Sequence, residues 1–342
     1  MRSHHVALPR TALAGVGLAL GGLAATARGR THRVADRIAG LDPVAEAQEV
    51  MWLLASREFG HDVETALSLA LFRTYASPSI SVVLEATGEF TARPRKRYDD
   101  TELIMAEMSK HGFDHPRGRT ALRRMNAMHA AYDIAATDTL YVLTTFILEP
   151  IRWIDRWGWR SLTDAERTAQ VISYRELGRH MGLGDLPDDL AWYERVNRAY
   201  EAEHFAYHPA NAAVADASMG MFLDMYLPAP LHRIGHAVVR ALLDPPVLDA
   251  FGYDPAPPAV VAGVHGALRA RAAVQRHLMP ERRTDYDLTA VRRPTYPDGH
   301  VVAELGSFPD GATRTRANSA IADLRAACPV SAPRAATAPA AP

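Results

Sequence analysis

The sequence predicts an all-α fold built as a single large helical domain. Apolar residues recur at spacings of three and four along most of the chain, and strands do not alternate with helices. With 342 residues and 48% hydrophobic content, the chain can bury a large core. We divide it into a hydrophobic leader at 1–33, a helical domain at 34–310, and a tail at 311–342 that is Ala/Pro-rich and disordered at its end.

An uncharged apolar run occupies residues 11–27. Two arginines precede it and four follow it closely, at 28, 30, 33 and 37. The positive-inside rule therefore predicts a retained membrane anchor with the body of the protein in the cytoplasm. The ending Ala25-Thr26-Ala27 resembles a signal-peptidase site, so export after cleavage is the alternative.

Two amphipathic helices are predicted at 34–59 and 62–75, because apolar residues recur at three and four in both ranges. Pro78 interrupts this pattern. Ser79 or Ser81 can cap a short helix that ends near Gly88.

The next predicted helix carries a cation and a hydroxyl on one face. Arg97 and Thr101 are four residues apart, so a helix that begins at Arg97 places both beside apolar side chains. The alternative for this arginine is a surface salt bridge with Glu102 or Asp100.

A histidine lies on the apolar face of the following helix, predicted at 116–134. Met125, His129 and Tyr132 share this face with Leu122. By pattern alone, such a histidine is more often a packed core residue than a ligand.

Further helices are predicted along the rest of the domain. Thr137 and Asp138 can cap a buried helix that Pro150 stops or kinks, and Thr163 with Glu166 has the form of a capping box. Helices also follow at 188–207, 231–243 and 258–278. We interpret three tryptophans as packing residues: Trp153, Trp157 and Trp159.

Two histidine pairs raise the question of a metal site. Glu201-x-x-His204 has the spacing used in di-iron carboxylate bundles, and His208 lies four residues further on. A di-iron site needs two such motifs together with further glutamates. His232 and His236 have no glutamate between them of the kind that zinc proteases require, so we leave both pairs out of the site.

Composition excludes several classes of function. The only cysteine, Cys328, cannot support a disulfide framework or a cysteine-based metal cluster, and its place in the tail argues against a thiolate-ligated haem. The net charge of −1 argues against a nucleic-acid partner. A Gly-rich phosphate loop and a Gly-x-Ser-x-Gly elbow are both missing from the sequence.

Four segments of the chain resemble a known family. They are LDPVAEAQEVMWLL, ALFRTYASPSISVVLEATGEF, RRMNAMHAAYDIAATDTLYVLTTFILEPIRWIDRWGWRSLTDAER and YPDGHVVAELGSFP. These are similar to the family of the ER-bound oxygenase MpaB, which in turn is similar to the catalytic domain of the latex-clearing protein. That rubber oxygenase holds haem b and cleaves isoprenoid double bonds with dioxygen.

The resemblance implies a haem pocket and names its residues. The family's Arg-x-x-x-Thr pattern matches Arg97 and Thr101, and its ligating histidine, in a Met-His-Ala-Ala run, matches His129. The chain departs from the pattern at Asp100 and Asp133, where the rubber oxygenase has basic residues. Both changes would alter the electrostatics of the pocket and put polymer cleavage in doubt.

The resemblance therefore implies a haem-dependent oxygenase with a rubber-oxygenase-like fold. His129 would ligate the iron of haem b, and Arg97 and Thr101 would support the cofactor and take part in catalysis. The expected partners are dioxygen and an apolar, isoprenoid-type substrate whose carbon–carbon double bond is cleaved or oxidised. Two alternatives stay open: a non-catalytic carrier of apolar ligands, and a non-haem iron oxygenase built on Glu201, His204 and His208.

Overall fold

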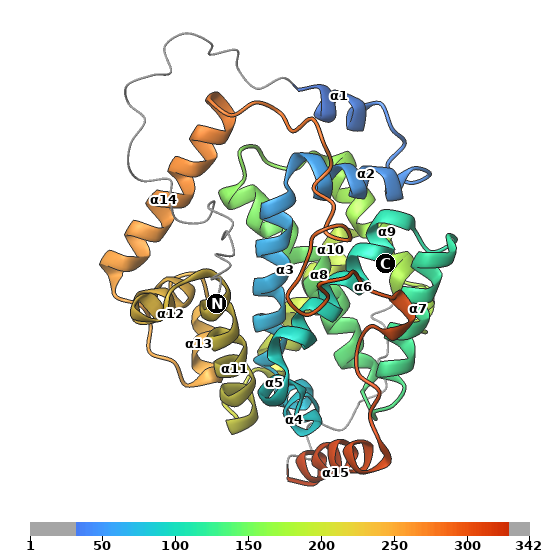
Figure 1. The fold of residues 1–342 in the computed structure, drawn as a ribbon, viewed down its shortest axis with the longest axis vertical. Helices are drawn as coiled ribbons and strands as arrows, with labels where there is room; N and C mark the ends of the chain where they lie inside the picture. Colours follow the sequence, from blue (N-terminus) through green and yellow to red (C-terminus); the bar gives the residue numbers. More distant parts are fainter. Residues whose placement is uncertain (1–31, 328–342) are drawn as a thin grey trace, which may run out of the picture.

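The computed structural model describes residues 32–327, and within that range the chain is all-α (Figure 1). It forms fifteen α-helices and no β-strand over these residues, with one isolated bridge between Arg293 and Tyr296. The predicted fold class is confirmed. The leader run at 11–27 and Cys328 lie outside the described residues.

The helices follow one another with short connections. Their bounds are α1 Arg33–Ala39, α2 Ala47–Leu53, α3 Gly60–Tyr75, α4 Pro78–Thr87, α5 Glu89–Ala92, α6 Pro94–His111, α7 Pro116–His129, α8 Ala136–Trp157, α9 Asp164–His180, α10 Leu190–His204, α11 Pro209–Tyr226, α12 His232–Arg240, α13 Pro245–Phe251, α14 Pro258–His277 and α15 Gly311–Ala327.

Helices α3 and α8 pack against each other at the centre of the molecule (Figure 1). Helix α8 is buried on nearly all sides, as its apolar sequence predicts, and it continues through Pro150 to Trp157. Of the two outcomes predicted for Pro150, a stop of the helix is therefore wrong, and a kink stays a prediction. Trp153, Trp157 and Trp159 are all buried, which confirms their interpretation as packing residues.

The single helix predicted at 34–59 is broken into three parts. Helix α1 ends at Ala39, α2 begins only at Ala47, and a π-helical turn at Leu54–Glu58 follows it. Gly40 and the Asp42-Pro43 step explain the first break, because a proline disfavours helical backbone in the residue before it. Periodicity alone did not reveal it.

Other helix ends differ from the predictions by a few residues. Helix α4 has its N-cap at Ser77, not at Ser79 or Ser81, and it ends at Gly88 with positive φ as expected. Helix α6 begins at Pro94 and not at Arg97. The N-cap of α8 is Ala135, so the predicted caps Thr137 and Asp138 lie inside its first turn. The capping box of Thr163 and Glu166 is present.

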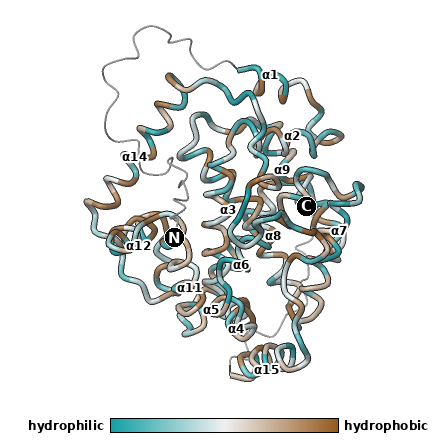
Figure 2. Tube along the Cα trace, in the orientation of Figure 1, coloured by the Kyte–Doolittle hydropathy of each residue, from teal (hydrophilic) through white to brown (hydrophobic). Residues whose placement is uncertain are grey.

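The last part of the described chain wraps around the helical body. After α14, which contributes no buried residue, the segment 278–310 crosses the front of the molecule as irregular chain (Figure 1). Residues 311–327, assigned to the tail from sequence, form α15, which packs on α4. Hydrophilic and hydrophobic residues alternate along α14, in keeping with its outlying position (Figure 2).

Within residues 32–327, no single helix is both long and apolar enough to cross a membrane. The pair α3 and α4 passes the same length and composition test only when taken together, and its two helices are bent by 100°.

Candidate functional site

A cavity of about 240 Å³ lies between helices α3, α4, α6, α7, α8 and α9. Its walls are mainly apolar, with aliphatic side chains, methionines and aromatic rings. The three residues assigned to the site from sequence, Arg97, Thr101 and His129, all line it. The structure therefore brings the side chains of these residues, from the consecutive helices α6 and α7, to one cavity.

His129 is the last residue of helix α7, and its side chain lines this cavity. The helix begins at Pro116, and the Nδ1 atom of His115 accepts a hydrogen bond of 3.2 Å from the backbone N–H of Arg117. Gly118 lets α7 approach the end of α6, because a Cβ atom there would lie 1.9 Å from the carbonyl oxygen of Gly112. The expected continuation of this helix through Tyr132 is wrong, although Tyr132 still lines the cavity.

The imidazole of His129 is held neutral. Burial, followed by the positive charge of Arg97, lowers its pKa to about 4. The side chain nevertheless keeps a large accessible surface, because that surface faces the cavity while protein atoms surround it on the other sides. Neither ring nitrogen has a hydrogen-bond partner among residues 32–327, so a neutral nitrogen lone pair is free to bind a metal.

Arg97 and Thr101 face the same cavity from α6. The Arg97 guanidinium donates a hydrogen bond to the Thr101 hydroxyl, which donates in turn to the Arg97 carbonyl oxygen at 2.9 Å. The guanidinium also lies 5.5 Å from the ring centre of Phe90. No carboxylate of the described residues lies within 4.0 Å of it, so this cation lacks an anionic partner.

The alternative salt bridge for Arg97 is not formed. Glu102 pairs with Arg293, and Asp100 pairs with Lys96 at 2.7 Å. Asp100 does line the cavity, but Lys96 and a hydrogen bond from the Tyr296 hydroxyl offset its charge. The second departure from the family pattern, Asp133, is exposed and pairs with Arg325 of α15, and it does not line the cavity.

Further polar residues line the cavity that sequence analysis did not assign to the site, among them Asp138, Tyr132 and Tyr174. Asp138 accepts a hydrogen bond of 2.6 Å from the Tyr200 hydroxyl, and burial raises the pKa of this carboxyl. The Tyr132 hydroxyl is buried without a well-formed hydrogen bond. The Tyr174 hydroxyl has no partner among the described residues, and its side chain is 9% exposed. Helical periodicity placed Tyr132 on the face of His129 but did not mark Asp138 or Tyr174, because their place in the cavity depends on how helices pack.

The residues considered for a non-haem metal serve other contacts. Glu201 is bound by Arg73, the His204 ring stacks on Tyr200, and the Nδ1 atom of His208 accepts from the backbone of α11. His236 is exposed. Within the described part of the chain, no three His, Cys, Asp or Glu side chains are grouped closely enough to hold a metal ion.

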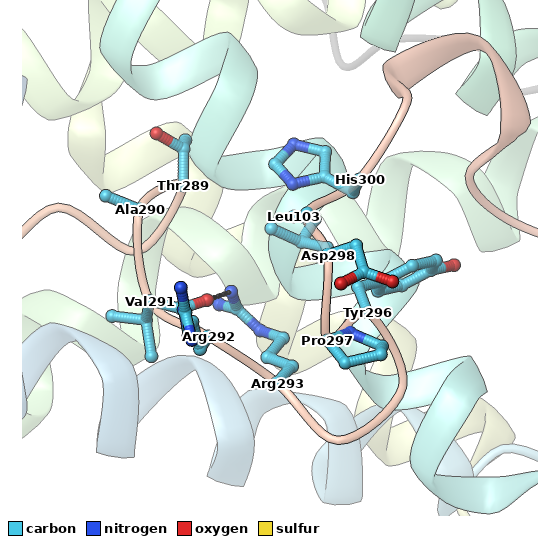
Figure 3. A pocket seen from close by; sticks show the side chains of 11 residues that line it. Leu103, Thr289, Ala290, Val291, Arg292, Arg293, Tyr296, Pro297, Asp298 and His300 are labelled. Atoms are coloured by element: carbon cyan, nitrogen blue, oxygen red, sulfur yellow. Dashed lines mark hydrogen bonds between the residues drawn. The ribbon is translucent and has the colours of Figure 1, made fainter.

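A second, smaller cavity of about 120 Å³ adjoins the first. A larger hollow of about 390 Å³ lies elsewhere, between Leu103 and the loop at 289–300 (Figure 3). Its lining is more polar than apolar, and none of the predicted site residues reaches it. We therefore place the candidate site in the apolar cavity of His129, where polar groups converge on an apolar space.

Comparison with known proteins identifies related chains. Residues 59–276 match the family described as ER-bound oxygenase mpaB/B'/Rubber oxygenase, catalytic domain. The chain is 32% identical over 248 residues to ER-bound oxygenase mpaB' of Penicillium brevicompactum, covering 67% of this chain and 58% of that protein.

Two other relatives carry the same description. ER-bound oxygenase mpaB of Penicillium brevicompactum is 32% identical over 196 residues, covering 52% of this chain and 50% of the relative. ER-bound oxygenase mpaB of Penicillium roqueforti is 30% identical over 227 residues, covering 61% of this chain and 76% of the relative. The matches span little more than half the length of the two Penicillium brevicompactum proteins.

Proposed function

The chain belongs to the family of ER-bound oxygenases MpaB and MpaB' and of rubber-oxygenase catalytic domains, and from this we propose that it is a haem-dependent oxygenase. Haem b would lie in the cavity of His129, with His129 as the iron ligand. The substrate would be an apolar, isoprenoid-type molecule, and the reaction would cleave or oxidise a carbon–carbon double bond with dioxygen.

The observation that carries this proposal is the pairing of two unpartnered groups on one apolar cavity. The His129 imidazole is neutral, so one ring nitrogen offers the lone pair that a metal ligand requires, and no described residue occupies it by a hydrogen bond. The Arg97 guanidinium has no carboxylate partner and suits a propionate of haem. The residues present therefore fit the cofactor. Bound haem would supply the reaction with dioxygen, a chemistry that the protein side chains do not provide.

The protein side chains have three tasks in this proposal. Thr101 holds the Arg97 guanidinium by a hydrogen bond, so the cation stays directed at the cavity. The burial that lowers the pKa of His129 keeps a ring nitrogen unprotonated at neutral pH. The apolar walls bind an unsaturated hydrocarbon chain and exclude water from it.

The alternative function is a carrier of apolar ligands, because the same cavity would serve such a protein. An ultraviolet-visible spectrum of the purified protein, made with ample haem supply, separates the two. We expect a Soret band that is lost or shifted in His129→Ala and unchanged in the control His236→Ala, since His236 is exposed and remote from the lining. Wild-type protein without a Soret band would refute the cofactor and favour the carrier.

We also propose that the protein associates with a membrane through the apolar run at 11–27, with its body in the cytoplasm. The relatives are described as ER-bound, which supports this proposal. Fractionation of cells that make the full chain, beside a chain that begins at residue 32, tests it. Recovery of both chains in the same fraction would contradict an anchor at 11–27.

A further inference from the structure

The smaller cavity shares a wall with the cavity of His129. Five side chains line both spaces: Leu71, Thr101, Met105, Phe146 and Tyr174. One of them, Thr101, is bonded to Arg97, so the shared wall lies directly beside the proposed cofactor site. A ligand that passes this wall would occupy both spaces.

The lining of the smaller cavity suits an uncharged apolar chain. Met51, Trp52 and Val63 are among its apolar residues. Its two carboxylates have partners within the protein: Glu64 accepts a hydrogen bond of 2.8 Å from the Tyr286 hydroxyl, and Glu102 is paired with Arg293. Both carboxylates of the lining are therefore engaged by neighbouring side chains, and the remaining wall is mostly apolar.

Tyr174 lies at the junction and lacks the partner that a buried phenol normally has. Its side chain is 9% exposed, and its hydroxyl makes no hydrogen bond with residues 32–327. Burial alone raises the pKa of this phenol, with no contribution from a hydrogen bond. Buried polar groups are paired in the great majority of proteins, so this unpaired hydroxyl on the shared wall is available to donate a hydrogen bond to a ligand in the cavity.

We propose that the smaller cavity is a second subsite, which holds the non-reacting end of a linear apolar substrate, and that the Tyr174 hydroxyl donates a hydrogen bond to an oxygen atom of that substrate where the two subsites meet. The inference rests on the proposed function, because it takes the larger cavity to hold the reacting double bond. The inference adds two properties to the proposed substrate: a chain long enough to reach the smaller cavity, and an oxygen atom that accepts a hydrogen bond.

The test compares three probes by titration calorimetry on the full chain under nitrogen, where no turnover occurs. Phytol is a long isoprenoid alcohol, phytane is its hydrocarbon counterpart, and geraniol is a short isoprenoid alcohol. Ala55 and Ser109 line only the smaller cavity, so Ala55→Phe and Ser109→Phe fill it from two sides. Ala270→Phe on the exposed surface of α14 is the matched control.

We expect each filling variant to weaken phytol binding by about tenfold or more, since a few methylene groups lose their burial, and to leave geraniol binding within about twofold. Equal weakening of both alcohols, or no change in phytol binding, would overturn the subsite. If one filling variant fails to fold, the other still allows the comparison to be made.

Tyr174→Phe tests the polar contact separately. We expect about three- to tenfold weaker phytol binding and unchanged phytane binding, because only the alcohol loses a hydrogen bond. Equal effects on phytol and phytane would show a packing role and overturn the contact. Unchanged affinities for both probes would also overturn it.

Failure of this inference differs from failure of the proposed function. If the protein shows a Soret band and phytol affinity is unchanged in the filling variants, only the second subsite is refuted. A protein without haem that shows the predicted dependence on chain length keeps both subsites and is a carrier.

Discussion

Two regions of this molecule differ in whether their arginine has carboxylate partners. In the Arg73 cluster, formed by Arg73, Glu149, Glu201, Asp244 and Tyr141, the guanidinium has a carboxylate on each side. Its closest measured contacts to Glu201 are 2.6 and 2.9 Å, and Tyr141 donates to the same glutamate at 3.2 Å. In the cavity of His129, the Arg97 guanidinium has no carboxylate partner among the described residues.

This difference distinguishes side chains that stabilise the fold from side chains that are available to bind a ligand. Every charge in the Arg73 cluster is opposed within the protein, so the cluster can be understood without any ligand. Arg97, His129 and Tyr174 are each left without the partner that their chemistry favours, and all three line the same cavity. Local conflicts of this kind are expected where function, and not stability, selects the residue.

The largest effect on stability should come from breaking the Arg73 cluster. Arg73→Ala leaves the Glu201 carboxylate, whose side chain is only 14% exposed, without its counter-charge, and we expect a loss of about 3–5 kcal/mol in the free energy of unfolding. Urea unfolding followed by circular dichroism measures it. The exposed Arg123 provides the control, and Arg123→Ala should change stability by less than about 0.5 kcal/mol. A similarly small effect of Arg73→Ala would remove the distinction between the two regions.

The second prediction concerns the pH dependence of stability through His129. Its pKa is about 4 in the folded protein, against an ordinary value of 6.5, so the folded state binds fewer protons between these values than the unfolded state. The stabilising contribution is complete above pH 6.5 and is lost as the pH falls toward 4. Solvent in the cavity screens the effect, and we expect about 1–2 kcal/mol.

Urea midpoints at pH 7 and near pH 4.5 measure this dependence, with His129→Gln as the comparison. The drop between the two pH values should be larger in the wild type than in the variant. An identical drop in both proteins would mean that His129 is not held neutral by the fold.

The third prediction sharpens the contrast between Arg73 and Arg97. Arg97→Ala removes a cation that has no anionic partner, so the apoprotein should change in stability by no more than about 1 kcal/mol. Haem retention should fall by about ten- to a hundredfold, because a charge-assisted hydrogen bond to a carboxylate is lost. Haem transfer to apomyoglobin measures retention. A stability loss as large as that of Arg73→Ala would show that Arg97 is a structural residue.

The smallest effect is expected at the surface pair of Asp133 and Arg325. Asp133→Ala should cost about 0.2–1 kcal/mol, as exposed ion pairs generally do, and should leave the Soret band unchanged. Chemical unfolding and the absorption spectrum check both points. A shifted Soret band would mean that Asp133 acts on the cavity, as the departure from the family pattern first suggested.

Sequence reasoning predicted those features that local chemistry decides. The capping box at Thr163, the helix end near Gly88 and the burial of helix α8 follow from residue type and spacing. The sequence also predicted the Arg97 and Thr101 pair on one helix face, while the assignment of His129 came from the family resemblance. The proposed roles of these three residues stay predictions.

Features decided by tertiary packing were not predictable in this way. Tyr174 lies on an ordinary helical segment, and only the arrangement of α3, α6, α8 and α9 places its hydroxyl at the junction of two cavities. The same holds for Asp138, which resembled a helix cap in sequence and instead accepts a hydrogen bond from Tyr200. Hydrogen bonds between residues far apart in sequence leave no periodic signal.

The irregular segment at 278–310 has a consequence for the order of folding. Tyr286 closes the smaller cavity by bonding to Glu64, 222 residues earlier, and Gly306 and Ser307 complete the lining of the larger one. Contacts of such sequence separation form late, because a long loop must close before they are made. Neither cavity has its full wall while these residues are still on the ribosome, so cofactor capture should follow the synthesis of the segment.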